Sequence, residues 1–123
     1  MAKILVIDDE ALIRTIMCDM LEGTGYNVVV APSGEEGLQT AKLERPDCIL
    51  LDIMMPGMDG YETCSALKAD PELAHIPVLL TSASSDVRIV DRAEHVGAIT
   101  VLQKPFRFEQ LQHAVALALN PPA

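Results

Sequence analysis

The sequence predicts an α/β fold in which one doubly wound, parallel sheet of five strands is covered by helices on both faces. Two observations support this prediction. Short apolar segments typical of strands alternate with segments of helical periodicity five times along the 123 residues. The segment Cys48–Asp52 is apolar up to its last residue, as is typical of a strand buried on both faces of a parallel sheet. Right-handed crossovers between successive strands then place helices on both sides.

The strands are expected at apolar, often β-branched runs that are bounded by turn residues. These runs are Lys3–Ile7, Tyr26–Ala31, Cys48–Asp52, Pro77–Thr81 and Ile99–Gln103. The helices are expected where apolar residues recur at every third or fourth position. They are Ala11–Glu22, 34–43, Tyr61–Ala69, a fourth helix ending near His95, and Phe108–Leu119.

The helix ends carry sequence signals of their own. Ser33 begins a capping-box pattern for the second helix, and Ser84 or Ser85 is the expected cap of the fourth. Gly97 is expected to close the fourth helix, and Asn120-Pro121-Pro122 to end the last one. The periodicity also predicts which residues face the core. In the first helix they are Ile13, Ile16, Met17, Met20 and Leu21, and in the last Phe108, Leu111, Val115 and Leu119.

Length and composition limit the functions that the protein can have. The chain fits one domain over residues 1–123, and no apolar run approaches the roughly 20 residues of a membrane span. The apolar start at Ile4–Ile7 is too short for a signal peptide, so a cytoplasmic location is expected. A net charge of −9 argues against direct nucleic-acid binding, which needs clustered basic residues. The three cysteines lack metal-ligand spacing and are expected to be buried in a reducing compartment.

Polar residues end or directly follow four of the predicted strands. Asp8 and Asp9 follow the first strand, Asp52 ends the third, Thr81 the fourth, and Lys104 follows the fifth. Taken singly, each fits an ordinary structural role: a helix-terminal acid, a turn cap, an edge hydroxyl or a solvated lysine. However, the carboxyl ends of parallel strands share one edge of the sheet, where such folds bind ligands. We therefore expect these side chains to converge on one crevice.

This set of groups favours phosphoryl chemistry. Clustered carboxylates suit Mg²⁺, which prefers oxygen ligands and can orient a phosphoryl group. The Asp52 carboxylate could then attack phosphorus and form an acyl phosphate. Lys104 and Thr81 would stabilise the phosphoryl oxygens by charge and by hydrogen bonding.

The chain resembles a response-regulator receiver domain over essentially its whole length. The matching motifs are VIDDE at Val6–Glu10, LLDIMMPGMDGYE at Leu50–Glu62, TSA at Thr81–Ala83, GA at Gly97–Ala98 and KPF at Lys104–Phe106. The resemblance implies a flavodoxin-like fold with strand order 2-1-3-4-5. Among receiver domains, the chain resembles the single-domain regulators of the chemotaxis and relay type. It also implies that Asp52 accepts a phosphoryl group from a sensor histidine kinase or a histidine phosphotransfer protein.

The resemblance assigns further roles by position. Asp9 and Asp52 would bind Mg²⁺ directly together with the backbone carbonyl of Met54, and Asp8 would act largely through metal-bound water. In the same way, Thr81 would be the switch hydroxyl and Lys104 the phosphate-sensing lysine, with a cis bond to Pro105.

One position departs from the family pattern. The residue three before Lys104 is often an aromatic that rotates with the switch hydroxyl, and here it is Val101. A short, β-branched side chain cannot make that movement. We therefore expect phosphorylation to shift 82–85 and the start of the fourth helix instead.

Two surfaces are predicted to bind partners. The face of the fourth helix, fifth strand and fifth helix, with Arg88, Arg92 and Val101, is the expected surface for a downstream target or a dimer. Leu12 and Phe106 flank the acidic crevice and are expected to contact a helical phosphodonor, although Leu12 fits the pattern of an ordinary exposed leucine equally well.

Three rival functions fit less well. A Mg²⁺-dependent phosphohydrolase with an Asp nucleophile usually needs a second acid two residues on, where this chain has Met54. A nucleotide-binding domain needs a glycine-rich loop after the first strand, and here that turn is Asp-Asp-Glu-Ala. A receiver-like module that binds without phosphorylation would not need the complete set of acids. The prediction is a signalling phosphoacceptor rather than an enzyme.

Overall fold

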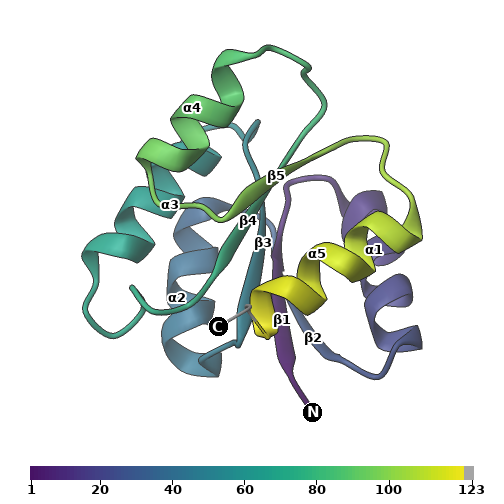
Figure 1. The fold of residues 1–123 in the computed structure, drawn as a ribbon. Coiled ribbons are helices and arrows are strands. Elements are labelled where there is room, and N and C mark those ends of the chain that lie inside the picture. Colours follow the sequence, from purple (N-terminus) through teal and green to yellow (C-terminus); the bar gives the residue numbers. More distant parts are fainter. Residues whose placement is uncertain (121–123) are drawn as a thin grey trace.

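The structure is a computed structural model that describes residues 1–120. A parallel sheet with strand order β2-β1-β3-β4-β5 forms its centre, with α1 and α5 on one face and α2, α3 and α4 on the other (Figure 1). This topology confirms both the predicted fold class and the strand order. The strands are β1 Lys3–Ile7, β2 Asn27–Ala31, β3 Cys48–Asp52, β4 Val78–Ser82 and β5 Thr100–Gln103. The helices are α1 Ala11–Gly23, α2 Gly34–Glu44, α3 Gly60–Ala69, α4 Arg88–His95 and α5 Phe108–Leu119.

The central strands supply both hydrophobic cores, because successive side chains of a strand point to opposite faces. Leu5, Ile7 and Leu51 pack with α2 and α3, whereas Val6 and Leu50 pack with α1 and α5. Every residue of β3 and β4 is buried. The ends of these strands are therefore held by packing on both faces.

The predicted caps are only partly correct. The Ser33 hydroxyl accepts a hydrogen bond from the Glu36 N–H at 3.2 Å, as expected. The reciprocal capping box forms at α3 instead, between Asp59 and Glu62. The prediction for α4 was wrong: this helix begins at Arg88 and has no side-chain cap, because the two serines lie in the preceding turns. The Ser84 hydroxyl accepts a hydrogen bond from the Asp86 N–H at 3.2 Å.

Some core assignments also need correction. Ile16 is 41% exposed, because the centre of the buried face of α1 lies at Met17 and Leu21. Phe108 is 36% exposed, since it is the first residue of α5 and precedes the buried positions of that helix. Cys18 is only partly buried, unlike the other two cysteines.

Other features follow the prediction. Gly97 has a φ of 91° and ends the turn after α4. This left-handed backbone conformation is favourable for glycine, which has no side chain. The last helix ends at Leu119, and the predicted stop at Pro121 and Pro122 lies outside the described residues. Within 1–120, no helix has both the length and the apolar character that a membrane span requires.

Candidate functional site

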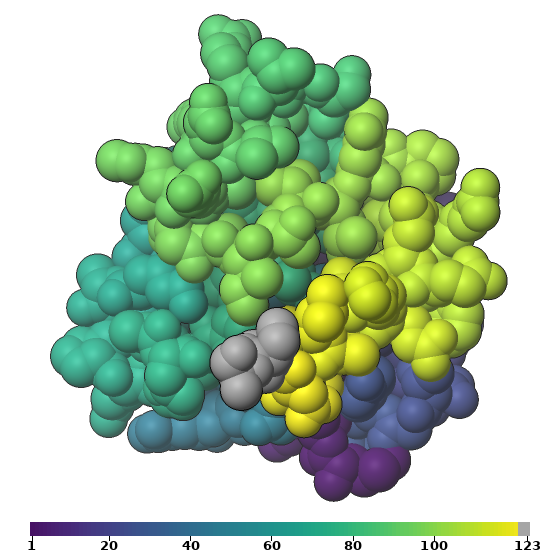
Figure 2. All heavy atoms as spheres, in the orientation of Figure 1, coloured from purple at the N-terminus to yellow at the C-terminus, as the bar shows by residue number. Residues whose placement is uncertain are grey.

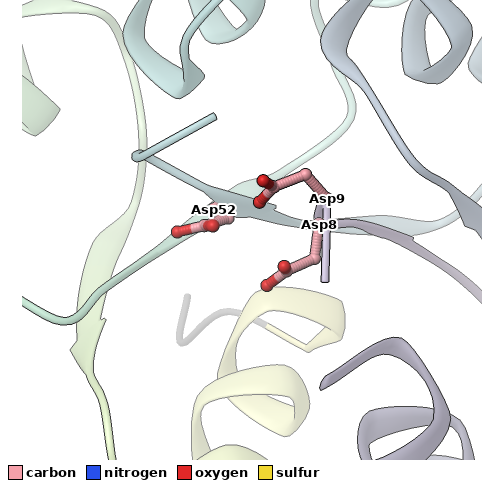
Figure 3. A group of neighbouring side chains, drawn as sticks. All are labelled: Asp8, Asp9 and Asp52. Atoms are coloured by element: carbon pink, nitrogen blue, oxygen red, sulfur yellow. The ribbon is translucent and has the colours of Figure 1, made fainter. Parts of the chain in front are cut away.

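Three carboxylates meet at the carboxyl edge of the sheet. Asp8 and Asp9 follow β1, Asp52 ends β3, and one oxygen of each lies within 4.8 Å of the others (Figure 3). Asp8 is 1% and Asp52 is 4% exposed, whereas Asp9 is open to solvent. The convergence predicted from the strand ends is therefore present, with one carboxylate facing outwards.

The backbone explains why these carboxylates align. Ile7 of β1 lies beside Leu51 of β3, so the next residue on each strand, Asp8 and Asp52, emerges at the same level. The turn after β3 is closed at Gly60, whose N–H donates to the Ile53 carbonyl at 2.9 Å. A Cβ at Gly60 would collide with the Asp52 carbonyl oxygen and would lie 2.6 Å from the Ile53 Cα. Only glycine allows α3 to start this close to the acidic residue.

Lys104 completes the pocket from the end of β5. Its ammonium donates to Asp8 Oδ2 at 3.0 Å and lies 3.5 Å from Asp52 Oδ1. Its backbone N–H donates to the Ser82 carbonyl at 2.7 Å, which keeps the end of β5 beside β4. The bond from Lys104 to Pro105 is cis, as expected.

Thr81 and Met54 lie on either side of the central carboxylate. Thr81 is 1% exposed and pairs with Asp52 in the register of β3 and β4. The Met54 N–H donates to Asp52 Oδ1 at 3.3 Å, while its side chain is 68% exposed. All the residues predicted for the site thus lie at one edge of the sheet.

The pocket disfavours the charged form of Asp52 and favours the charged form of Lys104. Burial raises the pKa of Asp52 to about 6, and the charge of Asp8 adds to this increase, although Lys104 opposes it. Burial lowers the pKa of Lys104, but its hydrogen bond to Asp8 and the charge of Asp52 outweigh burial and raise that pKa overall. One lysine against three carboxylates leaves the pocket with excess negative charge, which a bound cation would offset.

The contacts that hold Asp8 itself were not predicted from the sequence. The Arg14 guanidinium donates to the Asp8 carbonyl oxygen at 2.7 Å, and the Glu10 N–H donates to Asp8 Oδ1 at 2.9 Å. Arg14 reaches back from the first turns of α1 to the end of β1. A basic residue on a helix that follows an acidic strand end was the available signal.

Fold and pocket together define a class of small α/β domain that keeps a reactive carboxylate at the carboxyl edge of a parallel sheet. A family model described as "Response regulator receiver domain" matches residues 4–116. The chain belongs to the response regulator receiver domains.

Solved structures and curated proteins agree with this assignment. The chemotaxis protein CheY4 of Vibrio cholerae superposes with a TM-score of 0.92 at 33% identity, covering 97% of this chain and 99% of that one. Sporulation initiation phosphotransferase F of Bacillus subtilis is 34% identical over 113 residues, which are 92% of this chain and 90% of that protein.

Longer proteins match as well. A probable transcriptional regulator, ycf27, of Porphyridium aerugineum is 39% identical over 118 residues, which cover 96% of this chain but 48% of that protein. This chain spans about half the length of the first curated relatives that it matches. The shared part is the receiver domain. The chain is therefore a phosphoacceptor of two-component signalling and not an enzyme that turns over a separate substrate.

Proposed function

We propose that Asp52 is the residue that accepts the phosphoryl group. The observation that carries this proposal is its position: it is buried at the end of β3, the middle strand of the sheet, with Lys104 and Thr81 beside it. Asp9 is exposed at the rim, and Asp8 is already hydrogen-bonded to Lys104 at 3.0 Å. Asp52 is therefore the carboxylate best placed to react.

The donor set suits Mg²⁺, because it offers carboxylate and carbonyl oxygens and one side open to solvent. Asp9, Asp52 and the Met54 carbonyl would hold the ion directly, and Asp8 would hold it through water. When bound, Mg²⁺ supplies charge neutralisation at the phosphoryl oxygens and orients the incoming group.

The protein's own part in the reaction is nucleophilic attack. An oxygen of Asp52 forms a bond to phosphorus, the bond from phosphorus to the donor histidine nitrogen breaks, and the electron pair leaves with the imidazole. Lys104 stabilises the negative charge on the transferred group, because its ammonium already lies 3.5 Å from the acceptor carboxylate. The product is an aspartyl phosphate.

Phosphorylation would be transmitted through Thr81 and Lys104. A phosphate on Asp52 adds charge and acceptor oxygens, which draw the hydroxyl and the ammonium towards it. Val101 is partly buried against the core and has no aromatic ring to rotate. The response is therefore expected in residues 82–85 and the start of α4, whose N-cap residue Val87 provides no side-chain cap.

The phosphodonor would dock beside α1. An apolar groove of about 350 Å³ runs along this helix to the loop after β5. Leu12, which precedes the lining residue Ile13 in the chain, is 69% exposed. Sensor histidine kinases and histidine phosphotransfer proteins present their reactive histidine on a helix, which an apolar groove next to an acidic pocket can accept. The groove is lined by Ile13, Ile16, Met17, Met20, Ala83, Lys104, Pro105 and Phe106.

The downstream target, or a second copy of the chain, would bind the face formed by α4, β5 and α5. Figure 2 shows this face, with α4 above β5 and α5 below. Val90, Ile99 and Leu117 expose 63%, 55% and 46% of their surface there. Both arginines predicted for this face are exposed, but the Arg92 guanidinium lies over Tyr61, on the α3 side of the helix. The net charge of −9 makes a protein partner more favourable than nucleic acid.

We further propose that residues 1–123 act as one receiver domain and that it works in the cytoplasm, the compartment in which receiver domains meet their phosphodonors. The family match over residues 4–116 supports the first point. Neither Cys48 nor Cys64, both buried, is paired in a disulfide, which agrees with a reducing compartment.

The test is direct phosphorylation. With Mg²⁺ and acetyl phosphate the protein should gain one phosphoryl group that is stable to acid and labile to base, located on the peptide containing Asp52. The Asp52→Asn variant should not be labelled, while its circular dichroism spectrum remains that of the folded protein. Full labelling of this variant at another residue would refute the assignment.

A further inference from the structure

Arg92 of α4 and Tyr61 of α3 form a cation–π pair beside the loop that follows the phosphoacceptor. The guanidinium carbon lies 3.9 Å from the centroid of the tyrosine ring. Tyr61 is only 7% exposed, so the ring is fixed in the core and holds the guanidinium over it. Stacking uses the flat face of a guanidinium and leaves the N–H donors along its edge available.

Those donors have no acceptor among residues 1–120. Within the described residues 1–120, the Arg92 side chain makes no hydrogen bond and has no carboxylate within 4.0 Å. Arg88, one turn earlier on the same helix, donates to both oxygens of Asp86, the closer at 2.7 Å. In a chain of net charge −9, Arg92 is thus a positioned cation whose donors are not used.

Arg92 and Tyr61 also form one wall of a hollow of about 530 Å³, a volume within the range of ligand sites. The opposite wall is the loop directly after Asp52 and is mostly apolar. Its most exposed apolar side chain is Met54, and methionine adapts readily to different partners. The lining residues of this pocket, which we call the Arg92 pocket, are Ile53, Met54, Met55, Pro56, Gly57, Asp59, Tyr61 and Arg92.

We propose that the Arg92 pocket binds a segment of a partner protein in which an Asp or Glu stands next to a large apolar residue. The carboxylate would accept two hydrogen bonds from the guanidinium edge, and the apolar side chain would lie against Met54 and Pro56. A purely apolar segment would cover the donors of Arg92 without satisfying them, and a basic segment would be repelled. The acid among the lining residues, Asp59, already accepts a hydrogen bond from the Glu62 N–H at 2.8 Å. This interaction surface goes beyond the phosphoacceptor function.

The pocket adjoins the acidic site, because its lining residue Ile53 directly follows Asp52 in the chain. The Met54 N–H, at the pocket wall, donates to Asp52 Oδ1 at 3.3 Å. Any group that favours one arrangement of this loop therefore also alters the phosphoryl site, and phosphorylation alters the pocket by the same free energy. This coupling rests on the proposed role of Asp52, whereas the pocket itself does not.

The experiment is an NMR titration of the ¹⁵N-labelled full chain with three capped peptides that are otherwise identical. One contains a Glu-Phe pair, one Gln-Phe and one Glu-Ala. The Glu-Phe peptide should shift the amides of 53–61 and 88–92, and each of the other two should bind at least about tenfold more weakly, because each lacks one contact. Equal binding of the Gln-Phe peptide, or no shifts at these amides with any peptide, would overturn the proposal.

Variants of the chain locate the binding site of the peptide. Arg92→Gln should weaken Glu-Phe binding about tenfold, and Arg88→Gln on the same helix should leave it unchanged. Because Arg92→Gln could also displace α4, Met54→Gln provides a second probe that leaves the stack intact; it should weaken the Glu-Phe peptide but not the Glu-Ala peptide. Shifts confined to the groove beside α1, unaffected by either variant, would show that the peptide binds elsewhere. Binding should persist in Asp52→Asn, so a failure of the pocket and a failure of the phosphoacceptor assignment give different results.

Discussion

The carboxyl edge of the sheet has two halves that are built differently. In the pocket half, formed by β1, β3 and the first turn of α3, the strands are almost wholly buried and α3 has a full capping box. In the output half, formed by α4 and β5, the ends of the strand are exposed and the helix has one buried residue, Ala93. Regions with few buried contacts open at lower free energy than the core. The well-packed pocket half thus holds the acidic residues in place. The output half has fewer buried contacts and can change its conformation when the charge of the pocket changes.

The largest expected effect is at Gly60. A methyl group there has no room against the backbone of Asp52 and Ile53, so Gly60→Ala should lower the free energy of unfolding by about 1–3 kcal/mol. Urea titration measures this loss. Two controls sharpen the comparison: Gly23→Ala, where nothing lies within 4 Å of the new Cβ, and Val90→Ala on α4, where the side chain is 63% exposed. If either control lost as much stability, the contrast between the halves would be wrong.

The second effect concerns the charge of the pocket. Mg²⁺ should raise the free energy of unfolding by about 1.4 kcal/mol at about ten times its Kd, because it binds only the folded acidic pocket. Asp9→Ala should remove most of this gain, whereas Asp91→Ala, on the output half, should remove none. Thermal melting with and without Mg²⁺ at low salt measures both. If millimolar Mg²⁺ left the melting temperature unchanged, the carboxylates would not form an adequate metal site.

The same experiment has a defined pH dependence. Burial raises the pKa of Asp52 from 3.8 to about 6, so the fold disfavours its charged form. Without Mg²⁺, the stability contributed by Asp52 is therefore present below the lower value and is lost as the pH rises through the higher one. The gain from Mg²⁺ should be larger at about pH 8 than at about pH 5, where protons compete for Asp52. If Mg²⁺ raised the free energy of unfolding equally at both pH values, the ionised Asp52 carboxylate would not be its ligand.

The third effect tests the output half directly. Phosphorylation should change amide hydrogen exchange mainly at Ser82–Val90 and leave β1 and β3 protected, since these strands open only with the whole domain. A several-fold change in exchange rate is expected, which corresponds to about 1 kcal/mol. The Asp52→Asn protein treated with the same phosphodonor is the control. Changes confined to α1 and α2 would contradict the prediction that the output half responds to phosphorylation.

The smallest effect is expected for docking of the phosphodonor. Leu12→Ala removes exposed apolar surface beside the pocket and should slow transfer from a protein donor by about fivefold, equivalent to about 1 kcal/mol. Transfer from acetyl phosphate, which needs no docking surface, should be unchanged. Leu43→Ala, on α2, is the matched control, since Leu43 is also largely exposed, at 82%. Equal slowing with both donors would argue against docking at this groove.

Much of this arrangement could be predicted from the sequence because it depends on periodicity. The alternation of strands and helices gave the sheet, and the residues at the strand ends gave the pocket. What could not be predicted depends on neighbouring elements. Ile16 and Phe108 fit the apolar stripes, but a stripe does not reveal how wide a surface the sheet covers. The hydrogen bond from Arg14 to Asp8 and the stack of Arg92 on Tyr61 join different elements and leave no local pattern.

The contact between Lys104 and Asp8 has a consequence for how the protein is made. These residues are 96 positions apart in the chain and 3.0 Å apart in space. A ribosome releases Asp8, Asp9 and Asp52 long before it releases β5, so a growing chain contains the three carboxylates without Lys104. Until the last strand joins the sheet, the carboxylates repel one another without the lysine that pairs with Asp8 and Asp52. The complete pocket therefore exists only once the whole domain has been synthesised and folded.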